Sequence, residues 1–375
     1  MAADGPDYRR PLVVSVVGTR PEAIKMAPLV RCLAARSGLR QELILTGQHG
    51  GLRSFFDLPS SAVRTLDVDL SEQTAGEISE SLQHALWRQL LRSRPDLVLV
   101  QGDTSSALAG ALAARDCGIL IGHVEAGLRS GNLDQPWPEE PNRIRIDGLA
   151  ALLFAPTDLA ARRLESERLS GRIHVTGNTG IDALIEARGS SSTGSPASDR
   201  KLLLVTCHRR ENWHRLEEVA AALKRLVRLL PVEVAFLLHT NPRLRQAAQA
   251  ALAGEPHIKL LDPVAHREMV SLMDRSWAIL TDSGGVQEEG PALGKPVLVL
   301  RHVTERAEAL DTRNIELVGT DPERIFGAVA RLLRDPARYR LMAQPSFPFG
   351  DGNAAPRIAA LVDDFLADRA SLAVG

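Results

Sequence analysis

Three ionisable side chains stand where an enzyme built on a parallel sheet would place its chemistry. Arg20, Asp103 and Glu125 each follow closely on a short apolar run that predicts a buried strand. The carboxyl ends of parallel strands meet at one edge of a sheet, so we expect these side chains to lie near one another. A lone carboxylate at such a position more often caps a helix. Several that converge on one edge are harder to explain as helix caps alone.

A glycine-rich stretch in the second half of the chain has the pattern of an anion-binding turn. The apolar residues 277–280 lead towards Ser283-Gly284-Gly285, and a helical pattern follows. Glycines let the backbone approach a ligand closely, and the first helical turn offers N–H groups that the helix leaves unpaired. Glu289 lies in the first turns of this helix, where a carboxylate can reach ribose hydroxyls. Taken alone, the stretch is equally consistent with a strand–turn–helix joint without a ligand.

Basic side chains occur in both halves of the chain, near the strand-end carboxylates in the first half and before the glycine-rich stretch in the second. His208 and Arg209 follow the apolar run 202–206, and a histidine followed by arginines at a strand end is a plausible diphosphate clamp. Lys25 lies with Arg20 at the start of a predicted helix. The simpler interpretation of that pair is solvated surface charge, but their place at a strand's carboxyl end also allows a ligand.

A proline-rich segment carries two further candidates. Glu139 follows Pro136-Trp137-Pro138, and Arg143 comes four residues later. The prolines disfavour a helix at the start of this segment and predict a loop that feeds a helix. Glu139 and Arg143 are therefore either residues of a functional site or ordinary charged residues at the start of a helix.

The elements that would position these residues alternate along the chain. Apolar runs of strand length are followed by apolar residues at helical spacing, a pattern typical of doubly wound parallel sheets. Residues 173–179 read as a crossing from one domain into a second. The predicted strands are 12–17, 42–46, 96–100, 119–124 and 152–157 before the crossing, and 202–206, 234–238, 277–280 and 296–300 after it.

Composition narrows the class of protein. The chain has 375 residues, 44% of them hydrophobic and 24% charged, which suits two globular domains. A net charge of −1 gives no reason to expect a nucleic-acid partner, and no apolar run approaches the length of a membrane span. Cys32, Cys117 and Cys207 lack disulfide or metal-ligand spacing, which fits a reducing compartment and predicts a cytoplasmic protein.

Taken together, the motifs resemble those of the bacterial non-hydrolysing UDP-N-acetylglucosamine 2-epimerases. They occur in the family's order and cover nearly the whole chain. One departure is Cys207, which stands where the family commonly has glycine. The matching segments are 18–29, 102–104, 123–129, 138–143, 208–212, 282–289, 294–299 and 304–306.

The resemblance implies a glycosyltransferase-B-like fold, with two doubly wound Rossmann-like domains facing each other across a cleft. We expect the first domain over residues 1–176 and a UDP-binding domain over 177–358, with a C-terminal helix at 359–375 packing back on the first. The implied reaction interconverts UDP-GlcNAc and UDP-ManNAc, by elimination of UDP to 2-acetamidoglucal and its re-addition, and supplies ManNAc for surface polysaccharide. The family needs no metal or cofactor, and its members are usually homodimers.

The resemblance also implies roles for single residues. Asp103, Glu125 and Glu139 become the acid–base candidates, and which of them removes the C2 proton stays open. His208 matches the histidine near the leaving diphosphate, and Arg143 would orient the loop of Glu139. The remaining residues would bind the substrate, with Glu289 on the ribose: Arg20, Lys25, Arg209, Ser283, Gly284, Gly285, Glu289 and Arg306.

Other functions stay open at this point. The same fold serves glycosyltransferases, a hydrolysing 2-epimerase that releases UDP, 2-epimerases of related UDP-2-acetamido sugars, and a UDP-sugar sensor without turnover. Products distinguish these, because only a non-hydrolysing epimerase keeps the nucleotide on the sugar. An NAD-dependent epimerase is disfavoured, because residues 18–21 lack the G-x-G-x-x-G fingerprint of dinucleotide-binding turns.

Overall fold

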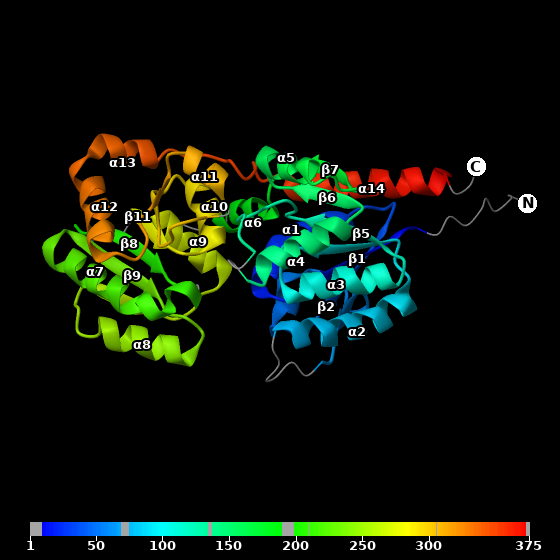
Figure 1. The fold of residues 1–375 in the computed structure, drawn as a ribbon, viewed down its shortest axis with the longest axis horizontal. Helices are drawn as coiled ribbons and strands as arrows, with labels where there is room; N and C mark the ends of the chain where they lie inside the picture. The colour runs from blue at the N-terminus through cyan, green and yellow to red at the C-terminus, as the bar shows by residue number, and fades with distance from the viewer. Residues whose placement is uncertain are drawn as a thin grey trace, which may run out of the picture. The chain divides into compact units, whose positions relative to one another are not determined.

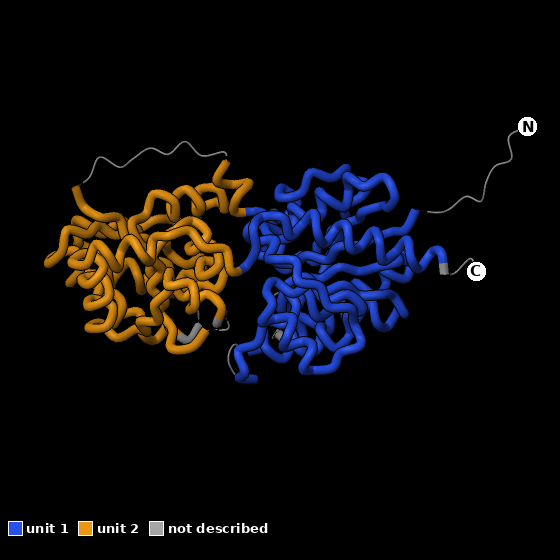
Figure 2. Tube along the Cα trace, turned by 90° about the horizontal axis from the view of Figure 1, so that it is seen from above, with its two compact units in different colours: residues 1–183, 349–375 blue, residues 184–348 orange. Residues whose placement is uncertain are grey.

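The structure is a computed structural model that describes residues 10–68, 75–133, 137–189, 199–208, 210–304 and 306–372. Arg209, one of the predicted ligand-binding residues, lies outside the described residues. The chain divides into two compact units, drawn in blue and orange in Figure 2. Unit 1 consists of residues 1–183 and 349–375, and unit 2 of residues 184–348.

Unit 1 is built on a parallel sheet with helices on both faces (Figure 1). Its strand order is β3-β2-β1-β4-β5-β6-β7, and every pair is parallel. The strands are β1 Leu12–Val17, β2 Arg40–Leu45, β3 Val63–Thr65, β4 Leu97–Gln101, β5 Leu120–Val124, β6 Leu152–Ala155 and β7 Arg172–Val175. The helices are α1 Arg20–Ala34, α2 Ala75–Ser93, α3 Ser105–Asp116, α4 Glu139–Leu149, α5 Asp158–Ser166 and α14 Ala354–Leu372, with short 3-10 turns at Leu52–Phe55 and Ser60–Ala62; α6 Thr179–Arg188 begins in unit 1 and ends in unit 2.

The central strand β1 shows why this sheet must be covered on both faces. All its residues are buried, and successive side chains enter opposite cores, because side chains alternate along a strand. Val14 and Val16 pack in one core with α2 and α3, whereas Val13 and Val17 pack in the other with α1 and α14. The apolar run seen in the sequence is thus a strand buried on both sides.

Helix α14 returns the end of the chain to unit 1. It packs against α1, and Arg36 forms an ion pair with Asp363 at 2.8 Å. Its first turn is held by the carboxylate of Asp182, which accepts hydrogen bonds from the backbone of Ala354 and Ala355 at 3.2 and 2.8 Å. The apolar face of this helix therefore completes the core over α1.

Unit 2 repeats the architecture. Its strand order is β10-β9-β8-β11-β12-β13, again with every pair parallel. The strands are β8 Lys201–Thr206, β9 Val232–Leu237, β10 Ile258–Leu261, β11 Ala278–Thr281, β12 Val297–Val299 and β13 Ile315–Leu317. The helices are α7 Leu216–Leu229, α8 Pro242–Leu252, α9 His266–Arg275, α10 Gly284–Ala292, α11 Ala307–Asp311, α12 Pro322–Arg334 and α13 Pro336–Met342, with a 3-10 segment at Arg210–Arg215.

The predicted fold class, two doubly wound parallel sheets, is confirmed. In each sheet the strand order reverses direction once, between β1 and β4 in unit 1 and between β8 and β11 in unit 2. Doubly wound sheets bind ligands at such reversals, where the two loops leave in opposite directions. In the part of the chain that the structure describes, no helix is long and apolar enough to cross a bilayer.

We predict that Ile358→Ala destabilises unit 1 by about 2–5 kcal/mol, because it opens a cavity where α14 meets the core. Ile358 is fully buried. Arg369→Ala, on the exposed side of the same helix, should change stability by less than about 0.5 kcal/mol. Urea unfolding followed by circular dichroism measures both, and equal midpoints for the two variants would show that α14 does not stabilise the unit.

Candidate functional site

In unit 1 the loops after β1 and β4 are joined by a buried carboxylate. Glu22 accepts hydrogen bonds from the backbone of Gly18 and Thr19 at 2.9 and 2.6 Å, and from the Thr104 hydroxyl at 2.6 Å. Thr19 caps α1 in return, which completes a capping box. Burial raises the pKa of Glu22, and these hydrogen bonds only partly oppose that rise. The spacing of Thr19 and Glu22 in the sequence predicts this capping box, which is confirmed, whereas the hydrogen bond from Thr104 was not predicted.

Glu125 lies at the end of β5 in an unusual backbone conformation. Its φ angle is +69°, which non-glycine residues seldom adopt and which concentrates at functional sites. The Lys25 ammonium forms an ion pair with this carboxylate, and the Asn178 amide donates to it at 2.8 Å. The side chains of Lys25 and Glu125 are only 14% and 4% exposed, so Lys25 is not a solvated surface charge.

Arg143 connects Glu125 with Asp103. Its guanidinium forms an ion pair with the Asp103 carboxylate, donates to the Glu125 carbonyl at 2.7 Å, and lies 3.8 Å from a Glu125 carboxylate oxygen. The neighbouring Asn142 donates to the Asp103 carbonyl at 2.9 Å. The two predicted carboxylates are thus brought together, as expected. The bridging by Arg143 was not predicted, since the sequence analysis linked this arginine to the loop of Glu139.

Glu139 is the first residue of α4. Its Oε2 is enclosed and makes no hydrogen bond with any described residue. The next residue, Glu140, is used structurally, because it accepts hydrogen bonds from the backbone of Ser130 and Gly131 at 2.9–3.1 Å. Burying a carboxylate oxygen without a donor is unfavourable, and among the described residues Glu139 Oε2 can therefore accept a further hydrogen bond.

Arg20 begins α1, as predicted, and is half-buried. Its backbone N–H donates to Nδ1 of His49 at 3.2 Å. Burial lowers the pKa of His49, which favours the neutral ring that accepts this hydrogen bond. Arg20 and Lys25 therefore sit on the first turns of one helix, at the edge of the sheet that also carries Asp103 and Glu125.

In unit 2 the loops after β8 and β11 are joined by Asp282. Its fully buried carboxylate accepts hydrogen bonds from the His208 backbone at 2.9 and 3.0 Å and from the Asn212 amide at 3.0 Å. Burial lowers the pKa of His208, and nearby His239 adds to that effect while Asp282 opposes it. His208 is therefore a neutral imidazole at neutral pH. Asp282 was not predicted as a site residue.

The glycine turn begins α10, as the sequence predicts. Ser283 precedes the helix and makes no side-chain capping bond, which leaves first-turn N–H groups available. The Arg306 guanidinium lies against Gly284, where an added Cβ would stand 2.7 Å from its central carbon. Arg306 is held in place by Glu288 at 2.9 Å. A helix N-terminus and a guanidinium thus share one small region, which suits an anion.

Glu289 faces a histidine that sequence reasoning missed. Nε2 of His266, at the start of α9, lies 3.5 Å from a Glu289 carboxylate oxygen. The two side chains are each 15% exposed, and that nitrogen makes no hydrogen bond with any described residue. A histidine at the first position of a helix gives no sequence signal of such a contact, because the two residues lie on different helices.

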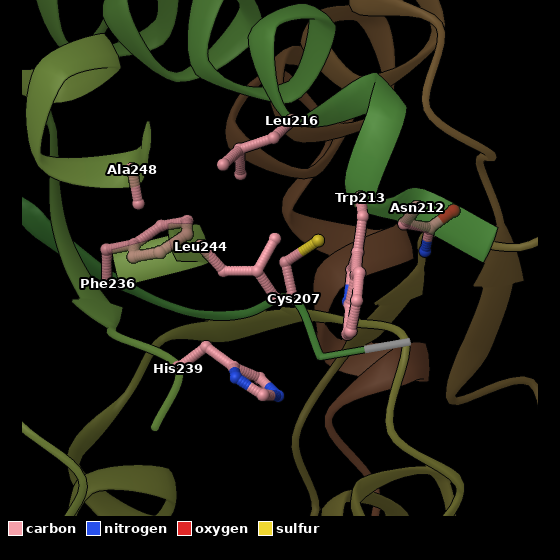
Figure 3. A pocket seen from close by; sticks show the side chains of 8 residues that line it. All are labelled: Cys207, Asn212, Trp213, Leu216, Phe236, His239, Leu244 and Ala248. Atoms are coloured by element: carbon pink, nitrogen blue, oxygen red, sulfur yellow. The ribbon is translucent and has the colours of Figure 1, made fainter. Parts of the chain in front are cut away.

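A small pocket beside Cys207 and His239 is drawn in Figure 3. It is lined by Cys207, Trp213, Phe236 and His239, among others, and its volume of about 10 Å³ holds roughly one water molecule. Burial raises the pKa of the Cys207 thiol, and Asp282 raises it further, so this thiol is unreactive at neutral pH. The pocket is therefore a gap in packing behind the site. Among the described residues no group of three His, Cys, Asp or Glu side chains is arranged to hold a metal ion.

Comparisons with known proteins agree with these features. The profile of the UDP-N-acetylglucosamine 2-epimerase family matches residues 31–363. A curated relative, UDP-N-acetylglucosamine 2-epimerase of Escherichia coli K12, is 41% identical over 363 residues, covering 92% of this chain and 96% of its own. The crystal structure of UDP-GlcNAc 2-epimerase from Neisseria meningitidis bound to UDP-GlcNAc has a TM-score of 0.89 at 36% identity, covering 94% and 99% of the two chains.

A more distant likeness shows the fold alone. MurG of Acinetobacter baumannii is 16% identical with a TM-score of 0.56, covering 94% of this chain and 100% of that one. This protein shares only the arrangement of the strands and helices. The predicted glycosyltransferase-B-like fold is thereby confirmed.

We predict that Thr104→Val destabilises unit 1 by about 1–3 kcal/mol, because it removes the cap of α3 and one hydrogen bond to the buried Glu22 carboxylate. Thr104→Ser keeps the hydroxyl and should retain most of this stability. Urea unfolding of both variants measures the difference. Only Thr104→Ser removes the methyl group, so equal losses in the two variants would show that the methyl group contributes as much as the hydroxyl and would contradict the prediction.

Proposed function

Because the chain belongs to the UDP-N-acetylglucosamine 2-epimerase family, we propose that it interconverts UDP-GlcNAc and UDP-ManNAc by inverting the configuration at C2 of the sugar. The observation that carries the proposal most directly is the ion-paired group of Asp103, Glu125, Arg143 and Lys25, of which Glu125 and Arg143 are buried. It supplies acid–base carboxylates at the reversal of strand order in unit 1, which is where such a fold binds ligands.

The chemistry sets the requirements for this group. No carbonyl acidifies the C2 proton of a pyranose, so its direct removal is slow. In the proposed route a base takes that proton, its bonding electrons form a C1=C2 double bond, and the C1–O bond breaks with its electrons leaving on UDP. UDP then attacks C1 of the 2-acetamidoglucal, and an acid delivers a proton to the opposite face of C2. Inversion therefore needs at least two acid–base groups.

The three carboxylates of unit 1 are proposed to share this work. Asp103 and Glu125 are each ion-paired, with side chains 25% and 4% exposed, and the ion pairs restrict their positions. Glu139 differs, because its buried Oε2 has no described donor. A hydrogen-bonding group of the sugar is the partner that we propose for this oxygen. Lys25 and Arg143 stabilise negative charge beside the reacting carbon.

The residues of unit 2 are proposed to hold the nucleotide. The first turn of α10 at Ser283, Gly284 and Gly285 offers N–H groups to phosphate oxygens, and Arg306 adds a positive charge beside Gly284. Neutral His208 lies at the adjacent strand end and is proposed to assist the departing diphosphate. Glu289 is proposed to accept hydrogen bonds from ribose hydroxyls, and Arg20 and Arg209 to bind phosphate.

The resemblance alone supports the remaining parts of the proposal. We propose that the enzyme acts as a cytoplasmic homodimer, without metal or cofactor. Its UDP-ManNAc product would supply ManNAc units for surface polysaccharide. These points follow from the family's properties and not from a particular contact in the fold.

Incubation with UDP-GlcNAc in heavy water tests the function. We expect NMR to detect UDP-ManNAc that carries deuterium at C2, together with recovered UDP-GlcNAc that is also deuterated. Release of free ManNAc and UDP would instead identify a hydrolysing enzyme, and transfer of the sugar to an acceptor would identify a glycosyltransferase. Epimerised product without deuterium would exclude proton exchange at C2. Asp103→Asn is the control, because it should lose turnover and still bind UDP.

We predict that Gly284→Ala weakens UDP binding by about tenfold, equivalent to about 1.4 kcal/mol. The new methyl group would stand 2.7 Å from the central carbon of the Arg306 guanidinium, so Arg306 must move from its place beside the turn and its ion pair with Glu288 is disturbed. Isothermal titration with UDP measures the affinity. The matched control is a double-mutant cycle with Arg306→Ala. In the Arg306→Ala background, Gly284→Ala should cause no further loss of UDP affinity. Additive losses would show that Gly284 acts independently of Arg306.

A further inference from the structure

A chain of buried charged side chains lies behind the carboxylates of unit 1 and takes no part in the proposed mechanism. It runs from His123 on β5 through Asp147 on α4 to Arg129 and Glu167. His123 and Asp147 are both 0% exposed. Buried ion pairs seldom add stability compared with well-packed apolar residues. We therefore ask which parts of the backbone these ion pairs hold in position.

The histidine end of this chain holds the turn that carries Asp103. Nδ1 of His123 lies 2.6 Å from Asp147 Oδ1, and Nε2 lies 2.7 Å from the Gly102 carbonyl oxygen. Both oxygens only accept hydrogen bonds, so the two contacts are satisfied together when both ring nitrogens carry hydrogen. Gly102 has a φ of +69° and directly precedes Asp103 in the sequence. The ring thus fixes the peptide from which Asp103 projects.

The carboxylate end holds the turn that follows Glu125. The second oxygen of Asp147 accepts from the Gly127 backbone at 3.2 Å and from Arg129 at 2.7 Å. Burial raises the pKa of Asp147, but the charges and hydrogen bonds of His123 and Arg129 outweigh it and hold the pKa below its ordinary range. Gly127 has a φ of +80°, only two residues after the positive φ of Glu125. A single ionised carboxylate therefore ties the two turns together.

Helix α4 connects this chain with the acid–base residues. Glu139, Arg143 and Asp147 are spaced four residues apart, so they lie along one face of the helix. Arg143 contacts Asp103 and Glu125, whereas Asp147 contacts the Gly127 backbone directly and the Gly102 turn through His123. The contacts of Asp147 therefore also restrict rotation of α4 about its axis and its translation along that axis, and Glu139 is the first residue of this helix.

We propose that Asp147 is a positioning residue that sets where Asp103, Glu125 and Glu139 stand relative to one another. It does so through His123 and the Gly127 backbone, without contacting the sugar. The inference rests on the proposed function, because it concerns the acid–base step of that reaction.

Asp147→Asn tests the inference, since it keeps the shape of the side chain and places an amide group opposite existing donors. We expect kcat per UDP-binding site to fall at least about tenfold, whereas KM for UDP-GlcNAc and the dissociation constant of UDP change by less than about threefold. A merely structural role would instead lower the number of UDP-binding sites per chain and leave kcat per site unchanged. That outcome, or a wild-type kcat, overturns the inference.

Two further variants keep the test decisive. Glu167→Gln alters the outer, one-third exposed end of the same chain and should leave kcat within about twofold. A loss as large as that of Asp147→Asn would overturn the inference, because the outer end touches neither turn. His123→Gln keeps a donor for the Gly102 carbonyl but loses the contact with Asp147, so it should also lower kcat, and it replaces Asp147→Asn if that variant does not fold. The wild-type enzyme in the same assay reports separately on the proposed function.

Discussion

A charged group taken out of water must meet an opposite charge or enough hydrogen bonds, and the candidate sites of both units are organised by this requirement. In unit 1 Lys25 pairs with Glu125 and Arg143 with Asp103, although 100 and 40 residues separate the partners in the chain. In unit 2 Arg306 pairs with Glu288 beside the glycine turn. Because the pairs are enclosed, their charges keep fixed positions before any ligand arrives. Preorganised charge of this kind is usually the largest contribution to enzyme catalysis.

The interior of the fold could be predicted from the sequence, whereas its edges could not. Every interior strand contains an apolar run, because the part of a strand that is buried on both faces needs apolar residues; in β2 only the second half, residues 43–45, is apolar. The strands that were not predicted are β3, β7, β10 and β13, which form the edges of the two sheets. β7, for instance, reads Arg-Ile-His-Val and has no fully buried residue. An edge strand has only one neighbour and a more exposed surface, so its composition resembles that of a loop.

The candidate site was predictable in its residue types but not in its connections. Strand ends located Asp103, Glu125 and the glycine turn, because the carboxyl edge of a parallel sheet is fixed by topology. The capping box of Glu22 was predicted, but its link to Thr104 and the links through Asp147 and Asp282 were missed. Each joins loops that are distant in the sequence, and the direction of a side chain does not follow from spacing alone. A signal was available in α4, where a glutamate, an arginine and an aspartate recur every four residues on a face that would otherwise be apolar.

The return of α14 to unit 1 has a consequence for how the protein is made. During synthesis the ribosome releases residues 1–183 first and all of residues 184–348 before the segment that completes the first core. Until Ile358, Val362 and Phe365 emerge, the apolar surface of α1 that they cover is open to solvent. Unit 2 is a single continuous segment, so all of it is translated, and can fold, before the last segment of unit 1 has been made. An incomplete polypeptide that lacks α14 therefore keeps an uncovered apolar surface, and such surfaces make partly folded chains prone to aggregation.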